Sequence, residues 1–398
     1  MPSRALFGSI LLLGAGSFIH ALRVIILSFL LGNHNFGAVS TILLISTLFA
    51  EFGTLGFSQL IYNQRLFTPR VISRASVNVS RFLLTGLSII SAMAVVTALV
   101  ISLAGPFHFW TLFITLICAA ANTMILASCR ASNNKFTHPT AFFLKSLVVL
   151  VDVAVLGSGH FHVESIILWG EVLATPVLFV YALRHGIIQP RWSVLRKVPG
   201  IVTIHWRVAF WAVMSSMSAL LFLNQERMAG AFFLTLAQMG VITKIILIKI
   251  IGGQSAFIFG TYFHRHVVGS DHAGRVQTFA VVRRYELYAY PALAVLCLLM
   301  TIPVQMAYRA FYGIELSFAV AIAAMILAIV FFFNPFAILL QASGRFGTIA
   351  RYNALVVALF FALALFSFDS SYVVIASAAT SSLWYVLVRR AAYRLLGS

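Results

Sequence analysis

Long apolar segments separated by short polar connections follow one another along the whole chain. A helix needs roughly 20 apolar residues to cross about 30 Å of hydrocarbon. Segments that meet or approach this length are residues 7–31, 39–62, 82–104, 107–129, 138–157, 163–182, 208–223, 239–263, 285–304, 316–340, 352–368 and 371–388. The pattern predicts an all-α polytopic membrane protein with about twelve transmembrane helices.

The basic residues indicate which side of the membrane each connection faces. When the N-terminus is placed inside, the outside connections contain only Arg227 and Arg309. Four further basic residues lie within spans, and the other 21 of the 27 lie in inside segments. Cytoplasmic connections carry an excess of Lys and Arg, and one missed helix would disrupt this alternation. The distribution therefore predicts that both termini are cytoplasmic.

The most polar connection divides the chain into two halves with six spans each. We expect an N-terminal six-helix bundle at 1–183, a cytoplasmic basic linker at 184–207 and a C-terminal six-helix bundle at 208–398. Because six is even, both halves begin inside, which predicts a parallel repeat about an axis along the membrane normal.

One pair of short connections supports such a repeat. Phe36-Gly37 and Met239-Gly240 align, and each dipeptide stands where the next span opens. The alternative is two unrelated turns that both end in glycine, which is common in turns.

The composition determines how the excess of basic residues should be interpreted. The chain is 61% hydrophobic and 9% charged, whereas soluble domains carry about 25% charged residues. This excludes a soluble enzyme or a disordered protein, and the net charge of +18 reflects membrane topology, so we expect no nucleic-acid partner. The sequence contains no GxxxxGK[ST], GxSxG or HExxH motif. We expect no enzymatic activity, no cofactor and no metal site.

Several loose motifs resemble those of a known transporter family. They are Leu31-Gly32 with Phe36-Gly37, the helix end Glu51-Phe52-Gly53-Thr54-Leu55-Gly56-Phe57, and Ile302-Pro303 followed by Ala310-Phe311-Tyr312-Gly313. Together with the twelve-span layout they resemble Wzx-type O-antigen flippases. These belong to the polysaccharide-transporter branch of the multidrug/oligosaccharidyl-lipid/polysaccharide exporter superfamily. The resemblance implies a fold like that of the MATE transporters.

The same resemblance implies a function and a location. The chain would translocate an undecaprenyl-diphosphate-linked oligosaccharide repeat unit by alternating access, from the cytoplasmic to the outer leaflet of a bacterial inner membrane. Its partners would be that lipid-linked oligosaccharide, membrane lipids, a proton or sodium gradient, and a polysaccharide polymerase with its chain-length regulator.

Three cations inside the spans are candidates for the substrate path. An ionisable group at mid-membrane costs about 2.5–3.5 kcal/mol, so it usually faces a cavity or a partner. A diphosphate needs cations to hold it away from bulk water. Arg23, Lys244 and Lys249 are therefore the predicted cationic lining, although Lys244 and Lys249 lie about 140° apart around one helix.

The buried acids are candidates for ion coupling. Glu51, Asp152 and Glu171 could titrate and link transport to a proton or sodium gradient. The alternative for every intramembrane charge is an internal ion pair, such as Lys145 with an acid on a neighbouring helix.

Other functions fit the sequence less well. A drug or metabolite antiporter of the same superfamily would favour an acid-lined cavity, but the spans hold four bases against about three deep acids. A polysaccharide polymerase or ligase would need a catalytic extracytoplasmic loop, and every outer connection is short. Resemblance to a lipid II flippase would imply fourteen spans.

Overall fold

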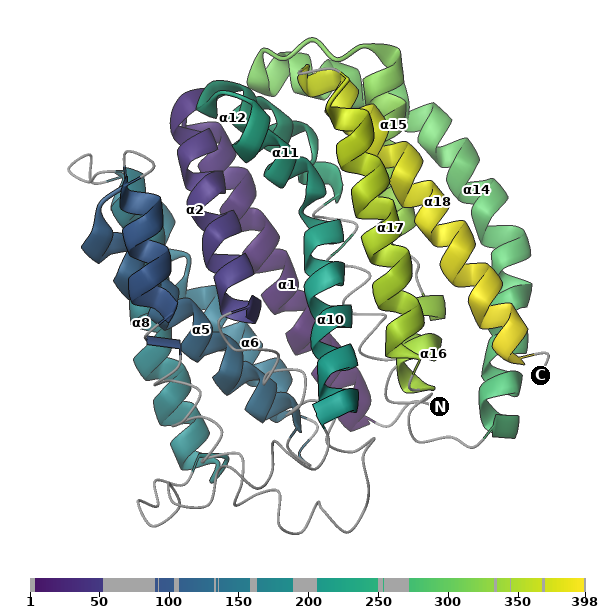
Figure 1. Cartoon of the computed structure of the whole chain (residues 1–398), viewed down its shortest axis with the longest axis horizontal. Coiled ribbons are helices and arrows are strands. Elements are labelled where there is room, and N and C mark those ends of the chain that lie inside the picture. Colours follow the sequence, from purple (N-terminus) through teal and green to yellow (C-terminus); the bar gives the residue numbers. More distant parts are fainter. Residues whose placement is uncertain are drawn as a thin grey trace. The chain divides into compact units, whose positions relative to one another are not determined.

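The computed structural model describes most of the chain, and every described element is a helix. The described residues are 4–52, 90–103 except 92, 107–131, 134, 136–157, 163–188, 206–249, 253, 272–332, 335–343, 345–366 and 369–396. Figure 1 labels all of the following helices except α7. They are α1 (Arg4–Leu30), α2 (Asn33–Phe52), α5 (Phe109–Ala131), α6 (Thr137–Val148), α7 (Val151–Gly157), α8 (Val163–Arg184), α10 (Trp206–Leu223), α11 (Gln225–Phe233), α12 (Leu236–Ile245), α14 (His272–Tyr312), α15 (Phe318–Phe332), α16 (Pro335–Ala342), α17 (Phe346–Ala364) and α18 (Ser370–Leu396).

The helices agree with the predicted spans. Within the described residues, seven helices are long and apolar enough to cross a membrane, and four shorter apolar helices accompany them. Each of these overlaps a different predicted span, and α2 overlaps the remaining one, 39–62. The predicted fold class, an all-α polytopic membrane protein, is confirmed.

One predicted span is interrupted within the described residues. The span predicted at 138–157 is divided into α6 and α7 by a turn at Val149 and Leu150. The span predicted at 316–340 contains α15 and α16, and residues 333–334 between them lie outside the described residues.

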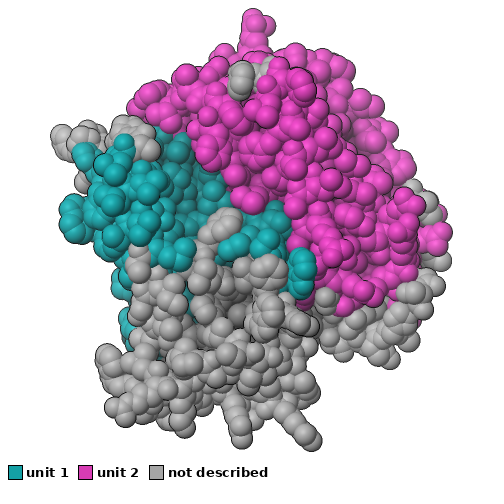
Figure 2. Space-filling model, viewed as in Figure 1, with its two compact units in different colours: residues 1–23, 38–220 teal, residues 24–37, 221–398 magenta. Residues whose placement is uncertain are grey.

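The chain forms two compact units, which Figure 2 colours separately. Unit 1 contains residues 1–23 and 38–220, and unit 2 contains residues 24–37 and 221–398. The first boundary therefore falls inside α1. Residues 189–205 of the predicted cytoplasmic linker lie outside the described residues, and the predicted division into two six-helix bundles stays a prediction.

Each unit has its own apolar core. In unit 1, α5 packs along α8, and Leu116, Met124 and Leu178 are among the buried side chains. In unit 2, α18 packs against α15 and α17 around residues such as Leu327 and Val374. Dispersion contacts between apolar side chains hold both cores, and small residues allow close approach of the helices.

Candidate functional site

A buried ion pair joins α1 to α7 in unit 1. The guanidinium of Arg23 donates to the carboxylate of Asp152, and both side chains are almost fully buried. Gly170 on α8 allows this arrangement, because a Cβ at that position would overlap the Asp152 carboxylate. A buried charge needs an opposite charge nearby, and here α1 supplies the base while α7 supplies the acid.

A second ion pair lies in the same unit and joins α6 to α8. Lys145 Nζ lies 3.1 Å from Glu171 Oε2. Asn122 on α5 donates to the same oxygen at 2.7 Å and also to the backbone carbonyl of Glu171. The alternative that Lys145 pairs with an acid on a neighbouring helix is thus confirmed. Asn122 was not predicted as a site residue, and a buried amide in the middle of an apolar span was the available signal.

The two pairs form one group of charges, which we call the Arg23 cluster: Arg23, Asp152, Lys145, Glu171 and Asn122. Glu171 interacts electrostatically with Asp152 and with Arg23 as well as with Lys145. The cluster contains two bases and two acids and is balanced in charge. Within the described residues, Asp152 Oδ1 and Asn122 Oδ1 accept no hydrogen bond, so two buried oxygens retain unused acceptor capacity.

Glu51, the third predicted ion-coupling residue, lies at the end of α2. It accepts a hydrogen bond of 3.4 Å from Ser216 on α10. The Glu51 carboxylate is thus in contact with a neutral hydroxyl on another helix of unit 1.

Unit 2 contains a different buried pair, between Lys249 and Glu226. Lys249 Nζ lies 2.7 and 2.8 Å from the two carboxylate oxygens of Glu226, which is fully buried on α11. Lys249 also donates to the carbonyl of Leu223, and Ser377 on α18 donates to Glu226. Glu226 was missed in the sequence because it stands in a polar run beside a span end, where an acid is normally solvated.

Lys244 has a different environment from the other buried bases. Its Nζ donates to Asn33 Oδ1 at 2.8 Å and to the carbonyl of Leu31 at 3.4 Å. It also lies over the rings of Phe36 and Tyr312, at 5.8 and 5.3 Å from their centroids. Within the described residues no carboxylate pairs with Lys244. Among the described residues, neutral oxygens and aromatic faces stabilise its charge.

The helices that surround Lys244 approach each other through two glycines. A Cβ on Gly37 would overlap the carbonyl of Leu236, the first residue of α12. A Cβ on Gly240 would overlap the carbonyl of Asn33, the first residue of α2. Each glycine is the fifth residue of its helix and contacts the first residue of the other. The contact is symmetric, as expected for two equivalent helix starts of a repeat.

The three predicted cations have separate partners. Arg23 belongs to unit 1, and Lys244 and Lys249 belong to unit 2. The predicted angle of about 140° between the two lysines assumed one continuous helix, but α12 ends at Ile245, before Lys249. The predicted acids Asp152 and Glu171 do lie together, in the Arg23 cluster. Whether these residues face a substrate path or a coupling ion stays a prediction.

Comparisons with known proteins show what the fold resembles. No protein-family model matches the chain, and no curated protein matches its sequence. Among solved structures, a MATE transporter in complex with MaL6 aligns with a TM-score of 0.65 and 13% identity, covering 99% of this chain and 97% of that one. A MOP-superfamily transporter from Pyrococcus furiosus aligns with a TM-score of 0.63 and 14% identity over 99% and 96% of the two chains.

A flippase also shares the architecture. The lipid II flippase MurJ, in an inward closed conformation, aligns with a TM-score of 0.55 and 13% identity, covering 94% of this chain and 85% of that one. At such low identities the likeness concerns the fold alone. The chain has the all-helical membrane fold of the MATE transporters and the MurJ flippase of the MOP superfamily.

Proposed function

We propose that this protein is a transporter, not an enzyme, and that it flips an undecaprenyl-diphosphate-linked oligosaccharide repeat unit across a bacterial inner membrane by alternating access. The fold supports a place among MOP-superfamily transporters and flippases. The observation that carries the choice of substrate is the environment of Lys244.

Lys244 supplies a buried positive charge with no carboxylate beside it among the described residues. Its present ligands, Asn33 Oδ1 and the carbonyl of Leu31, are neutral oxygens. Diphosphate oxygens carry negative charge and would interact with an ammonium group more strongly than neutral oxygens do. A diphosphate can therefore replace these ligands when α2 and α12 separate.

The buried acids argue against a cationic substrate. Asp152, Glu171, Glu226 and Glu286 each contact a basic side chain of this chain. A drug cation would have to compete with those internal bases. The Pyrococcus furiosus relative was described as having a binding pocket of reverse polarity that suggests a different function. We propose that polarity likewise separates this chain from drug exporters.

The Arg23 cluster is our candidate for coupling to a proton or sodium gradient. Its two unused acceptor oxygens, Asp152 Oδ1 and Asn122 Oδ1, lie in one group with the Glu171 carboxylate. A carboxylate oxygen accepts a proton, and carboxylate and amide oxygens both coordinate small hard cations. Entry of such an ion would weaken the pairing of Arg23 or Lys145 and so change how tightly α1 and α6 are held.

The direct test uses purified protein in proteoliposomes. A fluorescent undecaprenyl-diphosphate-linked oligosaccharide is added, and its outward movement is followed with a membrane-impermeant quencher under imposed proton or sodium gradients. We expect gradient-dependent flipping by the wild-type protein. A fluorescent cationic dye, tested in parallel, examines the antiporter alternative: dye transport without flipping would overturn the proposal in favour of that alternative.

The role of Lys244 is tested with matched variants. We expect Lys244→Gln to lower the flipping rate by more than about tenfold, because a charge-assisted hydrogen bond contributes about 1.5–3 kcal/mol. Arg309→Gln removes the same charge from an exposed side chain and is the control. If both variants flip at the wild-type rate, Lys244 does not bind the substrate. Lys244→Arg, which keeps the charge, should retain most of the activity if the role is electrostatic.

A further inference from the structure

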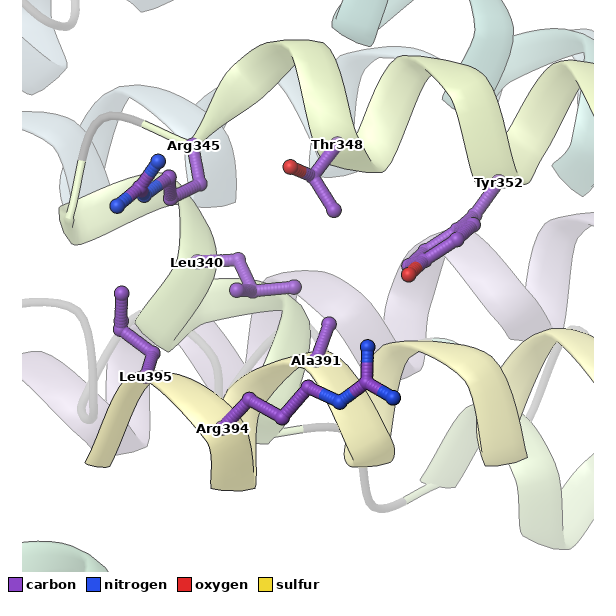
Figure 3. Close-up of a pocket in the computed structure, with 7 residues that line it drawn as sticks. All are labelled: Leu340, Arg345, Thr348, Tyr352, Ala391, Arg394 and Leu395. Atoms are coloured by element: carbon purple, nitrogen blue, oxygen red, sulfur yellow. The ribbon is translucent and has the colours of Figure 1, made fainter. Parts of the chain in front are cut away.

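A small pocket lies between three helices of unit 2, well away in sequence from the clusters described above (Figure 3). Its volume is about 220 Å³. Residues from α16, α17 and α18 line it: Leu340, Arg345, Thr348, Tyr352, Ala391, Arg394 and Leu395. The lining thus combines apolar side chains with two guanidinium groups and two hydroxyl groups.

The two arginines of the pocket carry uncompensated charge. Arg345 and Arg394 are exposed, and within the described residues neither pairs with a carboxylate. The chain has 27 bases and nine acids, so most bases have no internal acid available. Glu286, an acid that contacts α18, is already held by Arg389 and Tyr393. The excess of bases over acids favours an anion from outside the chain as a partner for these two arginines.

The start of α17 adds to the positive potential of the pocket. Arg345 is the residue before the first helical residue, and Thr348 lies in the first turn. The N-terminal end of a helix carries a partial positive charge and free N–H groups, which favour an anion. Arg345 makes no side-chain cap to those groups. The helix end and the arginines therefore attract the same type of ligand.

The surroundings of the pocket indicate the source of the anion. The distribution of basic residues places the beginning of α17 and the end of α18 on the cytoplasmic side of the membrane. The lipids of that leaflet include anionic phospholipids, and basic pockets between membrane helices bind such head groups. At about 220 Å³ the pocket is smaller than the roughly 300–1,000 Å³ of sites for drug-sized ligands. It has room for a head-group phosphate and not for an oligosaccharide.

We propose that this pocket binds the phosphate of an anionic phospholipid of the cytoplasmic leaflet. Arg394 and the Tyr352 hydroxyl lie on one side of Leu340 in Figure 3, and Arg345 lies on the other. A phosphate at either end receives charge-assisted hydrogen bonds from a guanidinium, and a lipid with two phosphates engages both arginines. Leu340 and Leu395 provide apolar contact for the adjoining glycerol and acyl carbons. This site is separate from the proposed transport function, and its test does not depend on that function.

The test measures lipid binding to the full-length protein in detergent by native mass spectrometry. Short-chain phosphatidylglycerol and phosphatidylcholine are titrated onto the wild type, onto R345Q/R394Q and onto a control, R351Q/R390Q. The control removes two exposed arginines from the same two helices but outside the pocket lining. We expect R345Q/R394Q to bind phosphatidylglycerol about tenfold or more weakly, as loss of charge-assisted hydrogen bonds implies. Binding by the control should change by less than about twofold.

Two results would overturn the proposal. Equal losses in R345Q/R394Q and R351Q/R390Q would mean that the lipid responds to net charge and not to this pocket. Displacement of phosphatidylglycerol by millimolar inorganic phosphate, with thermal stabilisation by phosphate in the wild type and not in R345Q/R394Q, would identify a soluble phosphate site instead. Phosphatidylcholine binding and elution volume monitor folding. Should the double variant aggregate, R394Q with R390Q as its control provides the same comparison.

Discussion

The two units hold their buried charges in different ways. In unit 1, Arg23 and Lys145 share one cluster with Asp152 and Glu171, in which Arg23 interacts with both acids and Glu171 with both bases. In unit 2 the charges are divided. Lys249 pairs with the Glu226 carboxylate, and Lys244 contacts neutral oxygens and aromatic rings. Unit 1 thus has a shared group of two bases and two acids, whereas in unit 2 Lys249 pairs with one carboxylate and Lys244 with none among the described residues.

This difference determines how each unit responds when one charge is removed. Breaking a buried pair is costly because it leaves an uncompensated charge in a medium of low polarity. In the Arg23 cluster, Glu171 still attracts Arg23 when Asp152 is neutralised. Lys249 keeps the Leu223 carbonyl as a partner when Glu226 is neutralised, but the like charge of Arg227 also acts on it. We therefore expect single neutralisations to destabilise unit 2 more than unit 1, in the following order.

The largest effect is expected for Glu226→Gln. It removes the carboxylate that pairs with the buried Lys249, at a cost of roughly 4–5 kcal/mol, the upper part of the range for a broken buried pair. The free energy of unfolding can be measured by denaturant titration in mixed micelles. The double variant Glu226→Gln with Lys249→Met removes both charges and should recover most of the loss. A double variant as unstable as the single one would show that the carboxylate has another structural role.

A smaller loss is expected for Asp152→Asn in unit 1. Glu171 continues to attract Arg23, so the cost should be roughly 3 kcal/mol, the lower end of the same range. The same denaturant titration measures this loss in the free energy of unfolding. A loss of unfolding free energy equal to or above that of Glu226→Gln would contradict the distinction between the Arg23 cluster and the pair of Lys249 with Glu226.

The close approach of α2 and α12 gives the next effect. A Cβ on Gly37 would overlap the backbone carbonyl of Leu236, which cannot rotate away, so Gly37→Ala should cost about 1–3 kcal/mol through overpacking. Gly32 stands five residues earlier with nothing within 4 Å of a built Cβ, and Gly32→Ala is the control. The midpoint of thermal unfolding in detergent compares the two. Equal midpoints would mean that α2 and α12 can move apart without a loss of thermal stability.

The smallest effect is expected at the surface of unit 2. Arg309 and Glu315 form an ion pair of 3.6 Å in which both side chains are about three-quarters exposed. Solvent screens such pairs, so Glu315→Gln should change the free energy of unfolding by less than about 1 kcal/mol. The same titration as for Glu226→Gln provides the contrast between a buried and an exposed pair. A cost similar to that of the buried pair would remove burial as the explanation.

The sequence identified most of the buried ionisable residues, but it did not identify all of the residues that contact them. Arg23, Asp152, Glu171, Lys244 and Lys249 were identified as intramembrane charges because an apolar run makes an ionisable residue conspicuous, and all five are buried. Glu226 and Asn122 were missed. Glu226 stands in a polar run that resembles a solvated connection, and a single amide in an apolar span is a weak signal.

The sequence could not predict which buried acids and bases form ion pairs, and the reason is geometric. Arg23 and Asp152 are 129 positions apart, and Lys249 and Glu226 are 23 apart across an irregular segment. Helical spacing relates residues only within one helix, and a turn at Val149 and Leu150 separates Lys145 on α6 from Asp152 on α7.

The sequence by itself determined the helical membrane fold, and it predicts which connections face the cytoplasm. Hydrocarbon requires long apolar helices, and basic residues concentrate in the connections on the cytoplasmic side of a membrane. Both patterns can be read from short segments of the chain. Only the tertiary structure decided which buried charges are neutralised internally. That depends on which helices meet, and contacts such as Gly37 with Leu236 and Lys244 with Asn33 join segments about 200 positions apart.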